Sequence, residues 1–287
     1  MKQINLLKYV LISIIFIYTT ACDKNDPLKD ILPEKVRTEF VNKFPNARMS
    51  DYSKHIEPFS SAEMWKVSFA DNIGMKSNSW FNSNGSWKLT YTELNSIDDL
   101  TFWAKRTFMR SEYADANIEQ IYKTERDGLL GSLYTLYFIS SDNVGFNLLI
   151  NDDGLFLNKT SWSLSAPSII INLPQDHFNF INDRYNDAEI RSYFYDFSEH
   201  EYIIKHEGKI KFVTFDWEDK EGSWKETRYE LDKNYQLPDN VIKYKEKNFP
   251  DFEYTNIYYI ELDKGNEYLS MSEDGKNKYG YHIREDA

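Results

Sequence analysis

Hydrophobic residues recur along this chain in four similar units, and each unit begins with a segment of helical spacing. In the first unit Val36, Phe40 and Phe44 fall on one helical face, and in the fourth Val241 and Phe249 do the same. The predicted helices begin near Leu32-Pro33, Thr101-Phe102, Leu173-Pro174 and Leu237-Pro238. Proline suits the first turn of a helix, where its missing N–H would be unbonded in any case.

The remainder of each unit alternates apolar and polar residues at the spacing of a β-strand. The predicted strands are residues 64–69, 79–81 and 87–94 in the first unit, and 133–138, 146–150 and 156–164 in the second. They are residues 190–197, 202–204, 212–217 and 224–231 in the third unit, and 254–262, 268–271 and 279–283 in the fourth. Short one-sided helices must pack on something, so the pattern predicts an α+β fold with helices on one face of antiparallel sheets.

The turns and the domain boundary follow from the same pattern. Asn84-Gly85 and Asp153-Gly154 are typical of tight hairpin turns, because Gly and Asn accept positive φ. The four helix-plus-strand repeats divide into two predicted domains, residues 32–166 and 171–287. Ser165-Ala166-Pro167-Ser168 is the candidate linker between them.

The N-terminus has the pattern of an export signal. Lys2 and Lys8 precede an uncharged apolar run at residues 9–18, which is too short to span a bilayer that needs ~20 apolar residues. Cys22 is the only cysteine in the chain, and it directly follows the small residues Thr19-Thr20-Ala21.

This arrangement resembles the bacterial lipobox, in which the cysteine receives a lipid, although Thr19 stands where Leu is commoner. We therefore expect a signal peptide at residues 1–21, a lipid on Cys22 and a tether at 22–31. The anchor would place the chain at the cell envelope, with the outer membrane favoured and its face left open. The alternative is an ordinary secretory signal with an incidental cysteine.

Composition limits the partners. The chain carries a formal net charge of −12 at pH 7, so phosphate backbones and anionic lipid headgroups would repel it. Nucleic acid is therefore not an expected partner, and membrane contact is expected only through the lipid. A plainer interpretation of the acidity is that it keeps an exported protein soluble.

Sequence features of the first unit resemble a known family. They are the Leu32-Pro33 start, the helix that ends at Phe44-Pro45, the strand Met64–Phe69 with Trp65, and Trp80-Phe81 before Gly85-Ser86-Trp87. Together they resemble the PepSY-like exported proteins of Bacteroidetes, which are related to the beta-lactamase inhibitor protein (BLIP) fold. The resemblance implies two tandem BLIP-like sheets, each built from two repeats with helices on one face. It implies a binding or inhibitory role and carries no catalytic residues.

Catalytic and metal-binding patterns are weak. The histidines are His55, His177, His200, His206 and His282. Without a cysteine in the body they do not make a predicted zinc site. Asn151-Asp152-Asp153-Gly154 lacks the spaced ligands of a calcium loop and is interpreted as a hairpin turn. No nucleophile or nucleotide motif occurs, so we expect no catalytic residue, metal or cofactor, while an enzyme of unrecognised type stays open.

A sheet that is covered by helices on one face leaves the other face free for a partner. The candidate binding residues are Trp65, Trp80, Trp87 and Trp224. If they point away from the helices, they form an aromatic face suited to an exported protein. A glycan is the alternative partner, in which case the chain would be a carbohydrate-binding accessory lipoprotein. The competing interpretation is that these residues pack beneath the helices.

Replacing Cys22 with Ser removes the only thiol that a lipid could modify. We expect the variant to appear in the soluble fraction, folded, while the wild type partitions with membranes. Fractionation of cells expressing each form measures this directly. A Cys22→Ser protein that is exported and still membrane-bound would contradict the predicted anchor.

Overall fold

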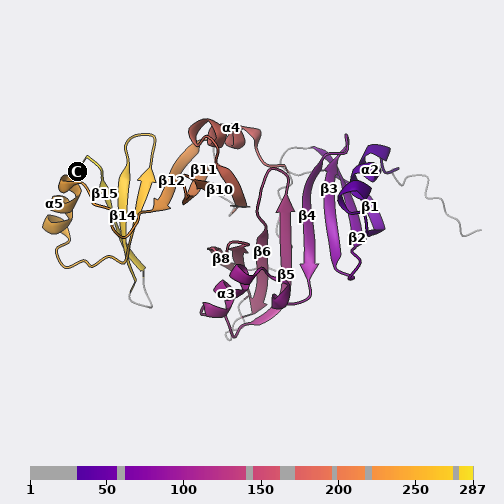
Figure 1. The fold of residues 1–287 in the computed structure, drawn as a ribbon, viewed down its shortest axis with the longest axis horizontal. Coiled ribbons are helices and arrows are strands. Elements are labelled where there is room, and N and C mark those ends of the chain that lie inside the picture. The colour runs from indigo at the N-terminus through magenta and orange to yellow at the C-terminus, as the bar shows by residue number, and fades with distance from the viewer. Residues whose placement is uncertain are drawn as a thin grey trace, which may run out of the picture.

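The computed structural model describes residues 31–56, 62–139, 145–161, 172–195, 199–216, 222–273 and 278–286. The predicted signal peptide, Cys22 and the predicted linker lie outside these residues. The described strands form an eight-stranded sheet and a seven-stranded sheet, both antiparallel, with neighbours in chain order (Figure 1). None of the described helices is long and apolar enough to span a lipid bilayer.

The first sheet contains the strands of the first two units. They are β1 (Arg48–Ile56), β2 (Glu63–Ala70), β3 (Lys76–Asn82), β4 (Trp87–Leu94), β5 (Asn117–Arg126), β6 (Leu133–Ile139), β7 (Gly145–Asn151) and β8 (Phe156–Ser161). Its helices are α2 (Glu34–Lys43) and α3 (Phe102–Arg110), and the short 3-10 helix η1 (Ile97–Asp99) precedes α3.

The second sheet repeats the plan. Its strands are β9 (Glu189–Tyr195), β10 (Glu199–His206), β11 (Lys209–Asp216), β12 (Trp224–Glu230), β13 (Asn256–Glu261), β14 (Glu267–Glu273) and β15 (Lys278–Arg284). Its helices are α4 (Gln175–Arg184) and α5 (Asp239–Asn248). The predicted α+β architecture of two tandem sheets is thus confirmed.

The helices begin where the sequence predicts. Pro33, Pro174 and Pro238 each stand immediately before the first helical residue, with φ of −58°, −58° and −56°. In the second unit Thr101 takes this place, and its Oγ1 accepts a hydrogen bond from the backbone N–H of Ala104. A side-chain cap thus replaces the proline start in that unit.

Two strands were not predicted from the sequence. β1 is an edge strand with mostly polar side chains, and none of its residues is buried. β5 lies inside the sheet, but its sequence NIEQIYKTER holds few apolar residues and a bulge between Ile118 and Gln120 interrupts its alternation. Polar composition and a shifted register together remove the period-two signal.

In each sheet both helices cover the same face. Under α2, the residues Val36 and Phe40 pack with Trp65, Val67 and Phe81. Under α3 the core contains Ala104, Phe108, Leu94, Ile121, Tyr134, Leu136, Phe138, Leu148 and Ile150. Strand pairing places Phe81, Ser79, Thr90 and Leu94 on one side of the sheet, so the two cores lie on the same face.

Glycine at a hairpin turn lets the turn touch the helix of the same unit. Gly85 has φ +98°, and a Cβ there would lie 2.8 Å from the carbonyl oxygen of Lys35 in α2. At Gly154, with φ +81°, a Cβ would lie 2.7 Å from the carbonyl oxygen of Trp103 in α3. Both glycines therefore serve the positive φ of the turn and the close approach to the helix.

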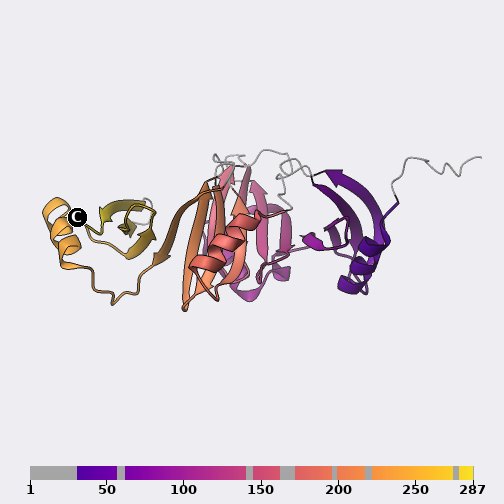
Figure 2. The same ribbon diagram turned by 90° about the horizontal axis from the view of Figure 1, so that it is seen from above.

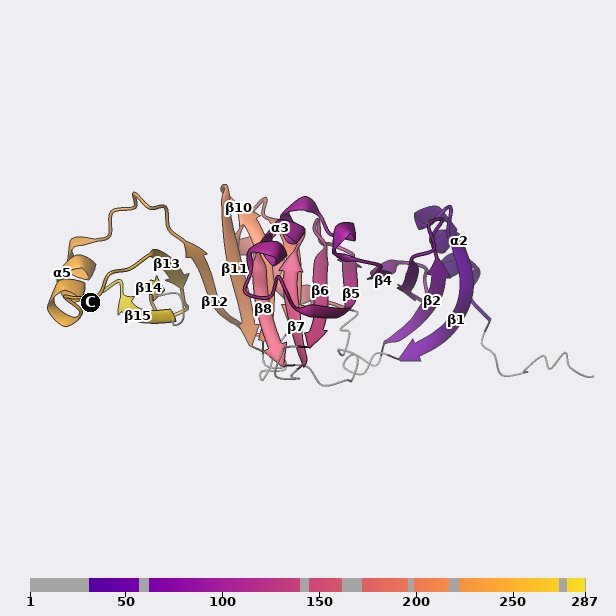
Figure 3. The same cartoon turned by 90° about the horizontal axis from the view of Figure 1, so that it is seen from below.

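The two sheets lie beside each other, and their helices are on the outer sides (Figures 2 and 3). Figures 2 and 3 show β6–β8 beside β9–β11, with α4 on one side of the pair and α3 on the other. The backbone N–H of Leu130 donates to the carbonyl of Ile190 at 2.9 Å, and Arg191 pairs with Asp153 at 2.9 Å.

Tyr137 and Ile203 point away from the helices of their sheets, yet they are only 2% and 0% exposed. The expectation that the face opposite the helices is free is therefore wrong where the sheets meet.

The glycine contact predicts an unequal response to two glycine substitutions. Gly74 has φ +87° and open space around its Cβ position, whereas Gly85 meets the α2 backbone. Gly74→Ala should cost about 1–2 kcal/mol of unfolding free energy through backbone strain alone. Gly85→Ala should cost a further ~1–3 kcal/mol because of overpacking. Urea unfolding of both variants measures the difference, and equal losses would contradict the proposed contact.

Candidate functional site

Two of the predicted tryptophans lie beneath helices. Trp65 is 4% exposed and belongs to the core under α2. Trp224 packs beneath α4, where Phe180 stacks on it at 5.3 Å and the guanidinium of Arg184 lies 4.3 Å from its ring centroid. Trp65 is thus closed to a partner, and Trp224 is partly covered.

Trp87 occupies in the first unit the place that Trp224 has in the third. Lys43, the last residue of α2, has its Nζ 3.4 Å from the Trp87 ring centroid. Arg184, the last residue of α4, has its guanidinium 4.3 Å from the Trp224 ring centroid. The indole N–H of Trp87 donates to Thr90 at 2.8 Å, and that of Trp224 donates to Thr227 at 3.0 Å. The repeated Trp-x-x-Thr pattern is therefore a structural element of the helix–sheet contact.

Trp80 is the exception among the four. It lies on the face away from α2, in a cluster with Met64 and Leu89, and is 6% exposed. The expected open face of four tryptophans is therefore not present, since two are buried and two are half-covered by cations and helices. A binding role for any single one of them stays a prediction.

An exposed aromatic surface is found instead on the outer side of α3. Phe102, Trp103 and Met109 are 69%, 52% and 49% exposed. The Phe102 and Trp103 rings meet edge to face at 5.0 Å, and the Arg106 guanidinium lies 5.4 Å from the Trp103 centroid. We call these four residues, together with exposed Arg110, the α3 surface.

The sheet beneath holds α3 firmly. The hydroxyl of Thr101 donates to the carbonyl of Asp152 at 2.8 Å, and that of Thr107 donates to the carbonyl of Gly154 at 2.5 Å. Ala104 and Phe108 are fully buried on the inner side. The exposed side chains therefore project from a rigid platform, which lowers the entropy lost when a partner binds.

The other described helices differ from α3 on their outer sides. The exposed residues of α4 are all polar: Gln175, Asp176, Asn179, Asn182, Asp183 and Arg184. α2 exposes one large apolar residue, Val41, and α5 exposes Ile242 and Tyr244 less fully. Among the described helices, α3 thus has the most apolar outer side. Its exposed apolar residues are not needed to pack the helix on the sheet, because Ala104 and Phe108 do this on the other side.

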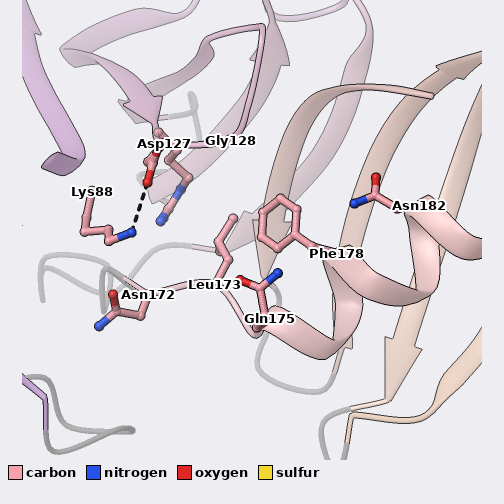
Figure 4. A pocket seen from close by; sticks show the side chains of 9 residues that line it. Lys88, Asp127, Gly128, Asn172, Leu173, Gln175, Phe178 and Asn182 are labelled. Atoms are coloured by element: carbon pink, nitrogen blue, oxygen red, sulfur yellow. Dashed lines mark hydrogen bonds and ion pairs between the residues drawn. The ribbon is translucent and has the colours of Figure 1, made fainter. Parts of the chain in front are cut away.

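A pocket lies between the first sheet and α4. Its volume is about 230 Å³, and it opens between the β5–β6 turn and α4 (Figure 4). Its lining residues are Lys88, Arg126, Asp127, Gly128, Asn172, Leu173, Gln175, Phe178 and Asn182. Lys88 and Asp127 form an ion pair at 2.9 Å across its first-sheet wall. The nine residues include no histidine or hydroxyl, and Asp127 and Lys88 are paired with each other.

The buried histidines have a structural role. His177 and His200 lie edge to face with centroids 5.0 Å apart, and burial lowers the pKa of each to about 4. They are therefore neutral at pH 7, with His177 stacked on Phe215 and His200 bonded to the Tyr193 hydroxyl. Within the described ranges, no three His, Cys, Asp or Glu residues are grouped so that they could hold a metal ion.

Glu201 is the buried acid of the second sheet. It lies on the face of the second sheet away from α4 and is 6% exposed. Its carboxylate accepts hydrogen bonds from Arg228 at 2.8 Å and from Thr214 at 3.4 Å. Burial raises the pKa of Glu201 to about 7, against the lowering effect of Arg228. Its partners are a strand arginine and a strand hydroxyl, so the group belongs to the sheet interior and not to the pocket.

Comparison with protein families gives one match. The PepSY-like family model, described as "Putative beta-lactamase-inhibitor-like, PepSY-like", matches residues 63–158 and 211–276, which together exceed half of the chain. The chain belongs to this family. The first match includes β2 to β7 with α3, and the second includes α5 and β13. Comparison with curated proteins gives no match.

Solved structures similar to this PepSY-like chain come from Bacteroides species. A DUF2874 family protein from Bacteroides ovatus is 22% identical, with a TM-score of 0.39, and covers 46% of this chain and 89% of its own. A BLIP-like protein from Bacteroides fragilis is 17% identical, with a TM-score of 0.43, and covers 52% of this chain and 100% of its own. A structure from Bacteroides eggerthii, described as "putative periplasmic proteins", is 14% identical with a TM-score of 0.39, and covers 46% and 90%.

The raised pKa of Glu201 predicts a pH-dependent stability. Between the ordinary glutamate pKa of 4.5 and about 7, the folded PepSY-like protein keeps a proton that the unfolded chain has released. Glu201 therefore makes the free energy of unfolding fall as the pH rises through this window. Glu201→Gln cannot titrate, so it should gain stability relative to wild type from pH 4.5 to above 7.

Chemical denaturation across this pH range measures the difference between the two proteins. Glu230→Gln, at an exposed position of β12, is the matched control and should show no such trend. A Glu201→Gln stability difference that stays constant with pH would contradict the assigned protonation.

Proposed function

We propose that this PepSY-like protein is a non-enzymatic binding module that recognises another exported protein, and that a lipid on Cys22 anchors it at the cell envelope. The α3 surface carries the proposal. Large apolar side chains on a soluble surface usually mark an interaction site when they are contiguous. Trp and Arg are also the residue types that dominate binding energy at protein interfaces.

Charge favours a protein partner with an acidic rim. Arg106 and Arg110 are both exposed on the α3 surface of a chain whose net charge is −12. A partner that places carboxylates opposite these arginines would gain charge-assisted hydrogen bonds. An anionic lipid surface fits less well, because exposed Asp98, Asp99 and Glu112 flank the helix at its two ends and would face the headgroups.

The geometry of the α3 surface also suits an inhibitory module. Phe102 and Trp103 stand together at the first turn of α3, with their rings edge to face. A pair of rigid rings at the end of a helix can enter a partner's cleft at little entropic cost. Inhibition would then follow from occupation of that cleft, with no chemistry required of this chain.

The test uses a double variant of the α3 surface, Trp103→Ala with Arg106→Glu. It should lose the saturable capture of the one envelope protein that wild type retains, by roughly thirtyfold for a hot-spot loss of 2 kcal/mol. Because both side chains are exposed, the unfolding free energy should change by no more than about 0.5 kcal/mol. Titration of immobilised protein with envelope extract, followed by identification of the retained band, measures the effect.

Val41→Ala is the matched control, because Val41 is the exposed apolar residue of α2. It should capture the same protein as wild type. Identical capture by the double variant would contradict the assigned surface. Transfer of the wild-type protein to anionic vesicles, with no saturable protein partner, would show that the surface docks on lipid and would overturn the proposal.

A further inference from the structure

The pocket between the first sheet and α4 is a separate feature from the α3 surface. One wall comes from the start of β4 and the β5–β6 turn, through Lys88, Asp127 and Gly128. The opposite wall comes from α4 and the residues just before it. Figure 4 shows Leu173 and Phe178 at the centre, between the Lys88–Asp127 pair and Asn182.

Both walls are held in place without a ligand. The Asp127 N–H donates to the Lys88 carbonyl at 3.0 Å, which ties the turn to β4. A Cβ on Gly128 would lie 3.3 Å from the edge of the Phe178 ring, so the turn backbone already touches α4. The Leu130–Ile190 hydrogen bond joins the same turn to β9. A pocket whose walls already touch each other, with one wall hydrogen-bonded to the strands on either side, is largely preformed.

The polar groups of the pocket match a polyhydroxylated ligand. Asn172, Gln175 and Asn182 bring three amides, a side-chain type that carries two donors and an acceptor. The Gln175 amide donates one hydrogen bond to Asn179 at 3.2 Å, and the Asn172 amide donates one to the sulfur of Met64 at 3.8 Å. The Lys88–Asp127 pair adds an ammonium donor beside a carboxylate acceptor. Sugar hydroxyls both donate and accept, so neighbouring hydroxyls can bond to each member of such a set.

The apolar groups and the size point to one sugar ring. Phe178 and Leu173 offer an apolar wall for the C–H face of a ring. At about 230 Å³ the pocket is smaller than the ~300–1,000 Å³ sites of drug-sized ligands. The charged lining is Lys88, Arg126 and Asp127, and a free phosphate would leave the apolar wall of Phe178 and Leu173 without a partner.

We propose that this pocket binds a single sugar unit, held by the amides and the Lys88–Asp127 pair against Phe178. Because the first sheet and α4 both contribute residues, an occupied pocket bridges the two halves of the molecule. The site is distinct from the α3 surface and does not depend on the proposed protein partner.

Ligand-detected saturation-transfer NMR tests the proposal with glucose, N-acetylglucosamine and glucuronate at millimolar concentrations. At least one of the three should bind wild type. Gln175→Ala and Asn182→Ala should each weaken that binding about tenfold, which corresponds to roughly 1.4 kcal/mol. Both residues are exposed on α4, so the variants should fold, and circular dichroism checks this.

Asn248→Ala is the control, because it removes an exposed amide from α5, outside the pocket. It should bind the sugar as wild type does, and so should the Trp103→Ala, Arg106→Glu variant. Absence of binding by all three sugars would overturn the proposal, and so would equal binding by the pocket variants and wild type. Loss of sugar binding and loss of protein capture are thus separate outcomes.

Discussion

The contact between the β5–β6 turn and β9 determines which surfaces of this molecule are available. The Leu130 N–H donates to the Ile190 carbonyl, and a Cβ at Gly131 would lie 2.4 Å from the carbonyl oxygen of Arg191. Only glycine permits that approach of two backbones. Once the two sheets are joined there, residues that point away from the helices, such as Tyr137 and Ile203, are buried. The sheet faces at the junction are therefore closed to a partner, and both proposed sites lie away from them, on the outer side of α3 and beside α4.

The junction is also connected to the helix that carries the α3 surface. Asp152 accepts at its side chain from the Ser132 N–H and at its carbonyl from the Thr101 hydroxyl. It therefore connects the start of β6 with the first turn of α3. The next residue, Asp153, pairs with Arg191 of β9. The Asp-Asp-Gly turn is thus a structural connector between α3, the first sheet and the second sheet, which agrees with its interpretation as a hairpin turn.

The sequence was sufficient to predict the helices and the repeat. It was not sufficient to predict on which face of a sheet each strand residue lies. Leu-Pro starts and one-sided helices are local features, so α2, α4 and α5 were predictable. The side on which a strand tryptophan lies depends on register, and bulges change it. A bulge between Trp80 and Phe81 in the β3–β4 pairing brings Trp87 to the α2 side. In the second sheet, a bulge between Thr214 and Phe215 brings Trp224 to the α4 side. Such shifts have no clear sequence signal.

The two proposed sites differ in how far sequence could reveal them. Phe102, Trp103 and Met109 lie off the apolar stripe that Ala104 and Phe108 define, so helical spacing alone could have identified an exposed apolar surface on α3. The pocket could not be predicted, because its walls come from segments far apart in the chain that meet only when the sheets join.

Hydrogen exchange of the Leu130 amide, resolved by NMR, tests the sheet junction most directly. The Leu130 side chain is 67% exposed on a turn, so only the bond to Ile190 accounts for protection of its N–H. The amide should exchange as slowly as those of the neighbouring core strands, since opening it requires the sheets to separate. Exchange at the rate of an unprotected surface turn would show that the two sheets move independently, and would contradict the account.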